Sequence, residues 1–386
     1  MDDVPWDLQQ FFLILILARI LVSTGFIGLW RKSGNVIPLF SAIFIILWDI
    51  TYTLLWYLDT FTLLFLGAPF GPGDVTGIAT ICAGVGWIAA GVSACDGELY
   101  QRGRCVNLMA LEKVTDRVYA DVTGENGGNY GAIVLDEEII MVDSGMIHLK
   151  SAVSKDYLSG KFGLPITKIL LTHHHSDHVF GAQAFEPMSF ISSSKTREIC
   201  VDALESTWSD EELQAWAEEN KETRPALWES IQTLRIIIPD VTFDEELRFG
   251  KDIVFRHIGG HTAGSSIVIV EPEHVLFIGD LLFNKSFPYA GDSSCNPDRW
   301  ISGLEEIVAN EYEIIIPGHG PLCGSEGITE EIEFLKKFRD LIKEALDEGL
   351  TFEQFIDENR TPDYYLEGAE HRVRVSVQHW FSFYGG

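Results

Sequence analysis

The stretch Ile169-Leu170-Leu171-Thr172-His173-His174-His175-Ser176-Asp177-His178 decides the fold. Its apolar first half predicts a short buried strand, and its second half places four imidazoles and a carboxylate directly after that strand. In an extended segment His173 and His175 project to the same side, while Asp177 and His178 follow on the turn. Imidazole nitrogen and carboxylate oxygen suit Zn²⁺, and also Fe or Mn, so this segment can offer ligands to two adjacent metal ions.

Three more candidate ligands follow later β-type runs. They are His261 in Gly-Gly-His-Thr-Ala-Gly-Ser (residues 259–265), Asp280 after Phe-Ile-Gly (277–279) and His319 in Pro-Gly-His-Gly (317–320). A single histidine beside glycine is usually structural. Four groups of donors in succession, each at the C-terminal end of an expected strand, instead predict one metal-binding edge.

The sequence resembles the metallo-β-lactamase superfamily over roughly 210 residues, from about residue 116 to residue 321. The motif H-x-H-x-D-H is matched without a gap by residues 173–178. The family's opening strands and later elements are matched, in chain order, by residues 125–129, 143–145, His261, Asp280 and His319.

This resemblance implies an α/β protein, an αββα sandwich with two metal ions at one edge between its sheets. The first metal ion would take His173, His175 and His261, and the second Asp177, His178 and His319, with Asp280 bridging the two. Two Zn²⁺ ions are the expected cofactors, with Fe or Mn as alternatives. Two cations that share a water lower its pKa toward neutrality and supply a hydroxide that attacks a carbonyl. Asp177 and Asp280 are therefore the expected catalytic carboxylates.

The ligand set narrows the expected reaction. A bridging carboxylate such as Asp280 resembles the glyoxalase II and lactonase branches, whereas true β-lactamases of this fold replace it. His175 stands where the flavodiiron branch carries Glu. The resemblance therefore implies a metallo-hydrolase acting on an ester, lactone or thioester. A mononuclear-iron persulfide dioxygenase remains an alternative, and so does a metal-binding sensor or scaffold without catalysis.

The net charge argues against nucleic-acid partners. The chain of 386 residues holds 28 Lys+Arg and 57 Asp+Glu, a net charge of −29. Residues 1–105 carry five basic and eight acidic residues, so the rest carries 23 and 49, a net charge of −26. Such a surface repels phosphodiester backbones. A small-molecule substrate is expected instead, while the sequence indicates no oligomeric state.

The composition predicts two domains: a membrane region in residues 1–105 and a metallo-β-lactamase-fold domain with a helical C-terminal tail in residues 106–386. Three apolar runs, residues 11–30, 37–58 and about 75–94, are each long enough to cross the hydrocarbon core. Basic residues follow the first and third runs, so the positive-inside rule places the catalytic domain in the cytoplasm. The sequence thus predicts an integral membrane protein with about three transmembrane helices and a lipophilic substrate.

Within the second domain, short runs rich in Val, Ile and Tyr predict strands. The runs are residues 117–122, 131–135, 138–142, 168–171, 189–192, 252–256, 266–270, 274–278 and 313–316. Capping patterns at Ser209/Glu212 and Thr351/Gln354 predict helix starts.

Two segments and two further histidines complete the expected site. The Trp-rich insertion 208–234 and the loop 283–300 are expected to cover the metal edge and recognise the substrate, although their aromatic residues could equally be core. His174 is expected to face outward, with contact to a ligand as the alternative. His257 is expected to be an ordinary polar residue that could reach a ligand.

Overall fold

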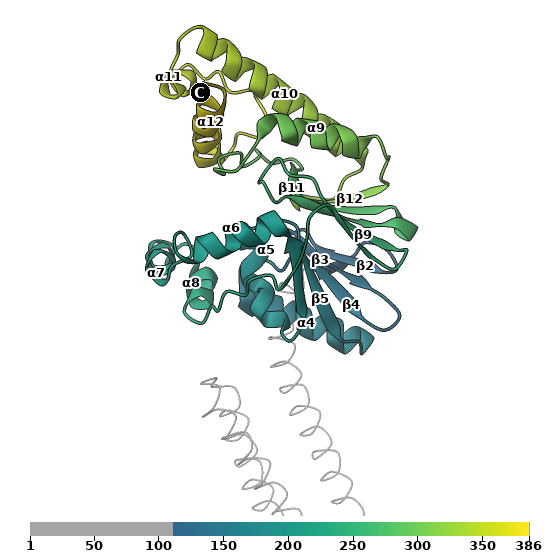
Figure 1. Ribbon diagram of the computed structural model, residues 1–386. Coiled ribbons are helices and arrows are strands. Elements are labelled where there is room, and N and C mark those ends of the chain that lie inside the picture. The colour runs from purple at the N-terminus through teal and green to yellow at the C-terminus, as the bar shows by residue number, and fades with distance from the viewer. Residues whose placement is uncertain (1–110, 386) are drawn as a thin grey trace, which may run out of the picture. The chain divides into compact units, whose positions relative to one another are not determined.

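The computed structural model describes residues 111–385, which fall within a compact unit spanning residues 107–386. Two sheets pack face to face, and each is covered on its outer side by helices (Figure 1). This four-layer arrangement confirms the predicted αββα sandwich.

The first sheet has seven strands in chain order: β1 (Leu111–Lys113), β2 (Val118–Asp121), β3 (Tyr130–Val134), β4 (Ile139–Val142), β5 (Ile166–Leu171), β6 (Ser189–Ser193) and β7 (Val241–Phe243). The second has five, in the order β12-β11-β10-β9-β8: β8 (Glu246–Phe249), β9 (Ile253–His257), β10 (Ser266–Val270), β11 (Val275–Phe283) and β12 (Ile314–His319). The nine strands expected from the sequence are all present. Short β1, β7 and β8 are additional.

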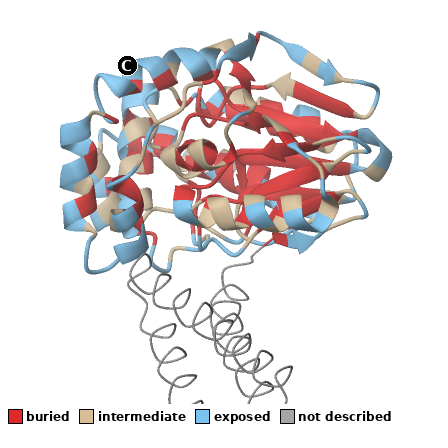
Figure 2. Cartoon of the chain, turned by 90° about the horizontal axis from the view of Figure 1, so that it is seen from below, coloured by how far each residue is buried: buried red, intermediate tan, exposed pale blue. Residues whose placement is uncertain are grey.

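The central strands are hydrophobic on both faces because both faces are covered, whereas the short strands β1 and β8 are partly exposed. In β4, Ile139 and Met141 enter the core under the helices of the first sheet, whereas Ile140 and Val142 enter the core between the two sheets. This is the period of two that a strand imposes on its side chains. Figure 2 shows the result, with buried residues concentrated along the strands and exposed residues on the helices.

The helices divide between the two outer faces (Figure 1). On the first sheet lie α4 (His148–Phe162), α5 (Ser176–Val179), η1 (Phe180–Phe185), α6 (Ser194–Leu204), α7 (Asp210–Glu219) and α8 (Pro225–Ile231). On the second lie α9 (Pro297–Val308), α10 (Ser325–Asp347), α11 (Phe352–Asp357) and α12 (Glu370–Gly385), while η2 (Glu271–Glu273) joins two strands. The expected caps are present: Ser209 accepts from the amide of Glu212 at α7, and Thr351 forms a complete capping box with Gln354 at α11.

The localisation expected from the sequence, an integral membrane protein, is corrected by the structure. Among residues 111–385, no helix has both the length and the apolar character needed to cross a bilayer. The 23-residue helix α10 is long enough, but Glu, Lys, Arg and Asp recur along it. The three expected spans lie outside the described residues. The domain boundary at residue 105 stays a prediction.

One carboxyl group is buried beneath the C-terminal helices. Glu331 on α10 is 0% exposed, and its Oε1 has no hydrogen-bond partner among the described residues. Its Oε2 accepts from the Tyr364 hydroxyl at 3.0 Å. Burial raises the pKa of Glu331 well above its ordinary value, so the folded protein holds a proton here that the unfolded chain releases.

We expect Glu331→Gln to stabilise the protein at pH 8 and to have little effect near pH 4. Because the pKa of Glu331 is raised in the folded protein, this group destabilises the fold as pH rises above the unfolded pKa. The loss is about 1.4 kcal/mol for each pH unit until the folded pKa is passed. The measurement is the unfolding temperature against pH, with Glu330→Gln as the exposed control. A Glu331→Gln variant that is less stable at pH 8 would contradict this account.

Candidate metal centre

The candidate ligands converge because several strands end at the same edge of the sandwich. His173, His175, Asp177 and His178 follow β5 or begin α5. From the second sheet, His261 lies between β9 and β10, Asp280 lies in β11, and His319 ends β12. All seven predicted residues meet there. The sequence predicts that Asp280 follows its strand, whereas in the structure it lies within β11. Strand β11 continues to Phe283 through register shifts on both sides of Gly279.

The first group consists of His173, His175, His261 and Asp280, whose donor atoms all lie within 4.8 Å of one another. The Nδ1 atom of His175 is 3.1 Å from Nε2 of His173 and 3.1 Å from Nε2 of His261. Nitrogen ligands about 2.0–2.1 Å from a tetrahedral zinc ion stand about 3.3–3.4 Å apart. The spacing of these nitrogens therefore suits a metal ion.

The second group consists of Asp177, His178 and His319. Oδ2 of Asp177 is 3.2 Å from Nε2 of His319. Asp280 lies between the two groups, since its Oδ1 is 3.0 Å from Nε2 of His178 and its Oδ2 is 3.5 Å from Nε2 of His173. These two clusters of His and Asp are able to bind metal ions.

Buried hydrogen bonds to Nδ1 fix the orientation of two imidazoles. Asp143 accepts from Nδ1 of His178 at 2.9 Å and from the Thr172 hydroxyl at 2.8 Å. Thr172 Oγ1 in turn lies 3.1 Å from Nδ1 of His173. With Nδ1 of both imidazoles donating, Nε2 is the nitrogen that each leaves for a metal ion. The opening motif contributes too, because the Asn129 amide donates to the carbonyls of Pro317 and Gly320, on either side of His319.

Asp292 lies in the site although the sequence did not reveal it. Its Oδ2 lies 3.1 Å from Nε2 of His175 and 3.2 Å from Nε2 of His174. Because Asp292 contacts Nε2 of His175, Nδ1 of His175 is the nitrogen that faces His173 and His261. The expectation that His174 faces outward is wrong, since that residue is 8% exposed and contacts Asp292. Asp292 lies in the loop expected to cover the site, but nothing in the sequence marks it among the other acidic residues.

Two unpartnered atoms show that the site fits metal ions. Nε2 of His178 and Oδ1 of Asp280 are buried and lie 3.0 Å apart, yet neither makes a hydrogen bond of acceptable geometry with any described residue. Glycines keep space beside both. A Cβ at Gly128 would lie 2.3 Å from Nε2 of His178, and a Cβ at Gly318 would collide with Oδ1 of Asp280. Because a buried polar atom without a partner is costly, the space and the free donor atoms together match a cation.

The protonation states differ between the two groups. Burial lowers the pKa of His261 to about 3 and that of His173 well below its ordinary value, so both are neutral. Burial also disfavours charge on His178, but Asp280, Asp177 and Asp143 outweigh it and raise its pKa. The second group therefore holds a proton that a metal ion would displace.

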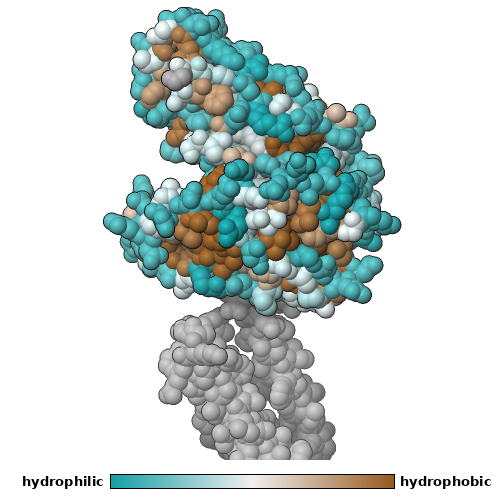
Figure 3. All heavy atoms as spheres, viewed as in Figure 1, coloured by the Kyte–Doolittle hydropathy of each residue, from teal (hydrophilic) through white to brown (hydrophobic). Residues whose placement is uncertain are grey.

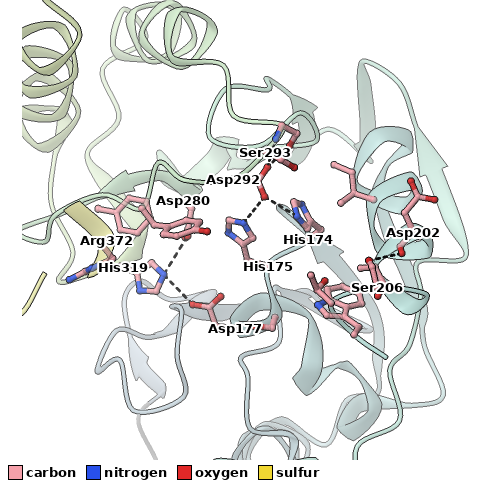
Figure 4. A pocket seen from close by; sticks show the side chains of 18 residues that line it. His174, His175, Asp177, Asp202, Ser206, Asp280, Asp292, Ser293, His319 and Arg372 are labelled. Carbon is pink, nitrogen blue, oxygen red and sulfur yellow. Dashed lines mark hydrogen bonds and ion pairs between the residues drawn. The ribbon is translucent and has the colours of Figure 1, made fainter. Parts of the chain in front are cut away.

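The candidate centre opens into a pocket of about 720 Å³, seen in Figure 4. Asp177, Asp280, His175 and His319 line it together with residues of α6, α12 and the loop 283–300. Figure 3 shows a hollow between the part of the surface that carries α12 and the part that carries α6 and α7.

Both segments expected to cover the site contribute to it. Trp208 of the Trp-rich insertion and Tyr289 of the loop 283–300 line the pocket. Trp216 lines a smaller neighbouring hollow that shares Trp208, whereas Trp228 lines neither. His257 does not reach a ligand directly: its Nε2 lies 2.8 Å from the carbonyl of Ala263, in the loop that carries His261.

Comparison with known proteins agrees with this geometry. The sequence model of the Metallo-beta-lactamase superfamily matches residues 123–319, about half of the chain, from the loop before β3 to the last ligand. The chain belongs to the metallo-beta-lactamase superfamily.

Two curated relatives are each about one-fifth identical to this chain. A linear primary-alkylsulfatase of a Pseudomonas species is 21% identical over 298 residues, 65% of this chain and 55% of that protein. A probable metallo-hydrolase of Streptococcus pyogenes serotype M6 is 22% identical over 215 residues, 53% of this chain and 84% of that protein. This chain thus spans just over half the length of the alkylsulfatase. Such relatives support a metallo-hydrolase.

Solved structures are also similar to part of this chain. A metallo-beta-lactamase from Pontibacter korlensis is 17% identical with a TM-score of 0.45, and the alignment covers 58% of this chain and 98% of that one. The superfamily assignment rests on the sequence model and not on this likeness.

We expect Asp292→Ala to weaken zinc binding roughly 10- to 100-fold, because His175 would lose the carboxylate that fixes its orientation and tautomer. The measurement is competition with a chromogenic chelator. Asp202→Asn is the control, since Asp202 lines the same pocket and makes no hydrogen bond or ion pair with a histidine among residues 111–385. Equal weakening in both variants would indicate a general loss of negative charge and contradict the assigned role.

Proposed function

We propose that this protein is a binuclear metal-dependent hydrolase that cleaves an ester, lactone or thioester. The observation that carries the proposal is the position of Asp280 between the two groups of imidazoles on the floor of the pocket: its Oδ1 lies 3.0 Å from His178, and its Oδ2 lies 3.5 Å from His173 and 3.4 Å from His319. His173, His175 and His261 would hold one metal ion, Asp177, His178 and His319 the other, and Asp280 would belong to both. Two such ions activate water near neutral pH and stabilise negative charge on a carbonyl oxygen.

The protein's own residues divide the remaining work. Asp143 orients His178 directly and His173 through the Thr172 hydroxyl, and Asp292 orients His175. Asp177 and Asp280 remain ionised although burial opposes it, because neighbouring imidazoles keep both pKa values below the ordinary range. Asp177 is the more accessible of the two, with 19% of its side chain exposed, so it lies where it can take a proton from water or give one to a leaving group.

The pocket walls favour a substrate with an apolar portion. Ile199, Ala203, Trp208, Phe283 and Tyr289 line them. Beyond Trp208 the smaller hollow continues with Phe180, Leu213 and Trp216. An alkyl or aryl group that leaves water for this wall gains about 25 cal/mol per Å² of buried apolar surface.

Sulfate ester hydrolysis is the second candidate. The similarity to a protein described as a linear primary-alkylsulfatase favours it, and an alkyl chain suits the apolar wall. A sulfate ester and a carboxylic ester differ at the reacting centre, so a substrate panel separates them.

The test is metal analysis combined with turnover. We expect about two metal ions per chain, hydrolysis within an ester, lactone, thioester and alkyl sulfate panel, loss of activity on chelation, and recovery with Zn²⁺ or, failing that, Fe or Mn. Asp280→Asn should reduce turnover to the level of the metal-free protein, because a neutral amide cannot balance two cations.

Other outcomes would contradict the proposal. Two metal ions per chain with no turnover on any member of the panel would indicate a binding role. One iron per chain with oxygen uptake on a persulfide would indicate a mononuclear dioxygenase.

Metal affinity should also depend on pH. Burial opposes charge on His319, but Asp280 and Asp177 outweigh it and raise its pKa to about 9. Since a metal ion must displace that proton, we expect zinc affinity to increase as pH rises toward 9, with proton release measurable by calorimetry in buffers of different ionisation enthalpy. Binding that is independent of pH from 6 to 9 would contradict these ligands.

A further inference from the structure

We propose that Arg372 of α12 binds an oxyanion group of the substrate, a carboxylate or a sulfate, so that the site acts on acidic substrates with an apolar tail. This inference rests on the proposed function, because it takes the same pocket to be the active site. It adds a chemical class of substrate that the metal ligands alone do not define.

Arg372 is the only Lys or Arg side chain that lines this pocket within residues 111–385. It reaches the pocket from the C-terminal helix, which follows Asp280 in sequence by 90 residues and lies outside the region matched by the family model. Figure 4 shows it beside His319, at the opposite end of the pocket from Asp202 and Ser206. An anion held there would lie next to the metal centre.

The guanidinium has donors to spare. Nη1 of Arg372 donates to Ser286 Oγ at 2.9 Å, and among the described residues this is its only hydrogen bond. No carboxylate of the described chain lies within 4.0 Å of it, whereas Arg235 pairs with Glu186 and Arg360 with Glu348. A guanidinium has five N–H donors in a planar fork that matches two oxygens of one oxyanion.

The charges around Arg372 make its lack of a carboxylate partner among the described residues unusual. The chain carries a net charge of −29, so carboxylates are abundant as partners. Arg372 is instead half-buried and directed to a pocket in which Asp280 and Asp177 belong to the metal groups and Asp292 is occupied by two histidines. With two divalent ions bound, repulsion between like charges would disfavour a cation at this place. An anionic substrate group would supply the missing partner of Arg372 and would offset its repulsion from the metal ions.

The rest of the pocket defines the orientation of the bound substrate. The oxyanion lies at the Arg372 end, the bond to be cleaved lies over Asp280, and the apolar part extends along Tyr289 toward Trp208. A substrate of this kind carries its negative charge on one side of the scissile bond and its hydrocarbon on the other.

The first arm of the test is equilibrium binding to the metal-loaded full chain by calorimetry. The probes are hexanoate and hexyl sulfate, with hexan-1-ol as the neutral reference. We expect Arg372→Gln to raise the Kd of at least one anion tenfold or more, and the two probes show which oxyanion is preferred. Arg374→Gln is the matched control, because Arg374 lies on the same helix over the ring of Phe352 and does not line the pocket.

The second arm compares two substrates that differ by one carboxylate, 4-nitrophenyl hexanoate and mono-(4-nitrophenyl) adipate. The ratio of kcat/KM for the anionic over the neutral ester should fall tenfold or more in Arg372→Gln, chiefly through KM, and stay within twofold in Arg374→Gln. Arg372→Lys should keep part of the preference, since it retains the charge.

Anion binding that is the same in wild type and Arg372→Gln would overturn the inference, and so would equal losses in Arg372→Gln and Arg372→Lys. The binding arm needs no turnover. Anion binding through Arg372 in a protein that hydrolyses nothing would therefore contradict the proposed function alone, while hydrolysis that is indifferent to Arg372 would contradict this inference alone.

Discussion

The buried carboxylate of Asp280 is the constraint on which the rest of the site depends. It is 4% exposed, yet it stays ionised because imidazoles from His173, His178 and His319 surround it. Burying an unpaired carboxylate would cost several kcal/mol, so the fold must bring cationic or metal-binding groups from distant segments to this one place. The sandwich does so by ending β5 and β12 at one edge and carrying Asp280 past that edge on β11.

The supporting residues follow from that constraint. Glycine is required at positions 128 and 318, because a Cβ there would collide with Nε2 of His178 or Oδ1 of Asp280. Asp143 adopts a positive φ of 57° directly after β4, where it collects hydrogen bonds from Thr172 and His178. Aspartate tolerates this left-handed conformation better than most residues, and such backbone strain is typical of functional sites.

The sequence predicts those parts of the site whose signal is local. The ligands in residues 173–178 share one short segment, and His261, Asp280 and His319 each follow a recognisable β-type run. Strands such as β10 are predicted to the residue because apolar side chains fill them, whereas β1 and β8 mix apolar with charged residues and give no such signal.

The rest of the site depends on contacts between distant residues. Asp292 meets His175 across 117 positions, and Arg372 enters the pocket from the last helix, so neither could be identified among many similar residues. The predicted orientation of His174 is wrong because Asp292, from the distant loop 283–300, contacts its imidazole and helps to bury it.

Anomalous diffraction at the zinc absorption edge, from crystals of the zinc-loaded protein, tests the central claim most directly. The account predicts two peaks, one among His173, His175 and His261 and one among Asp177, His178 and His319, with Asp280 between them. A single peak, or two peaks that do not share Asp280, would contradict it.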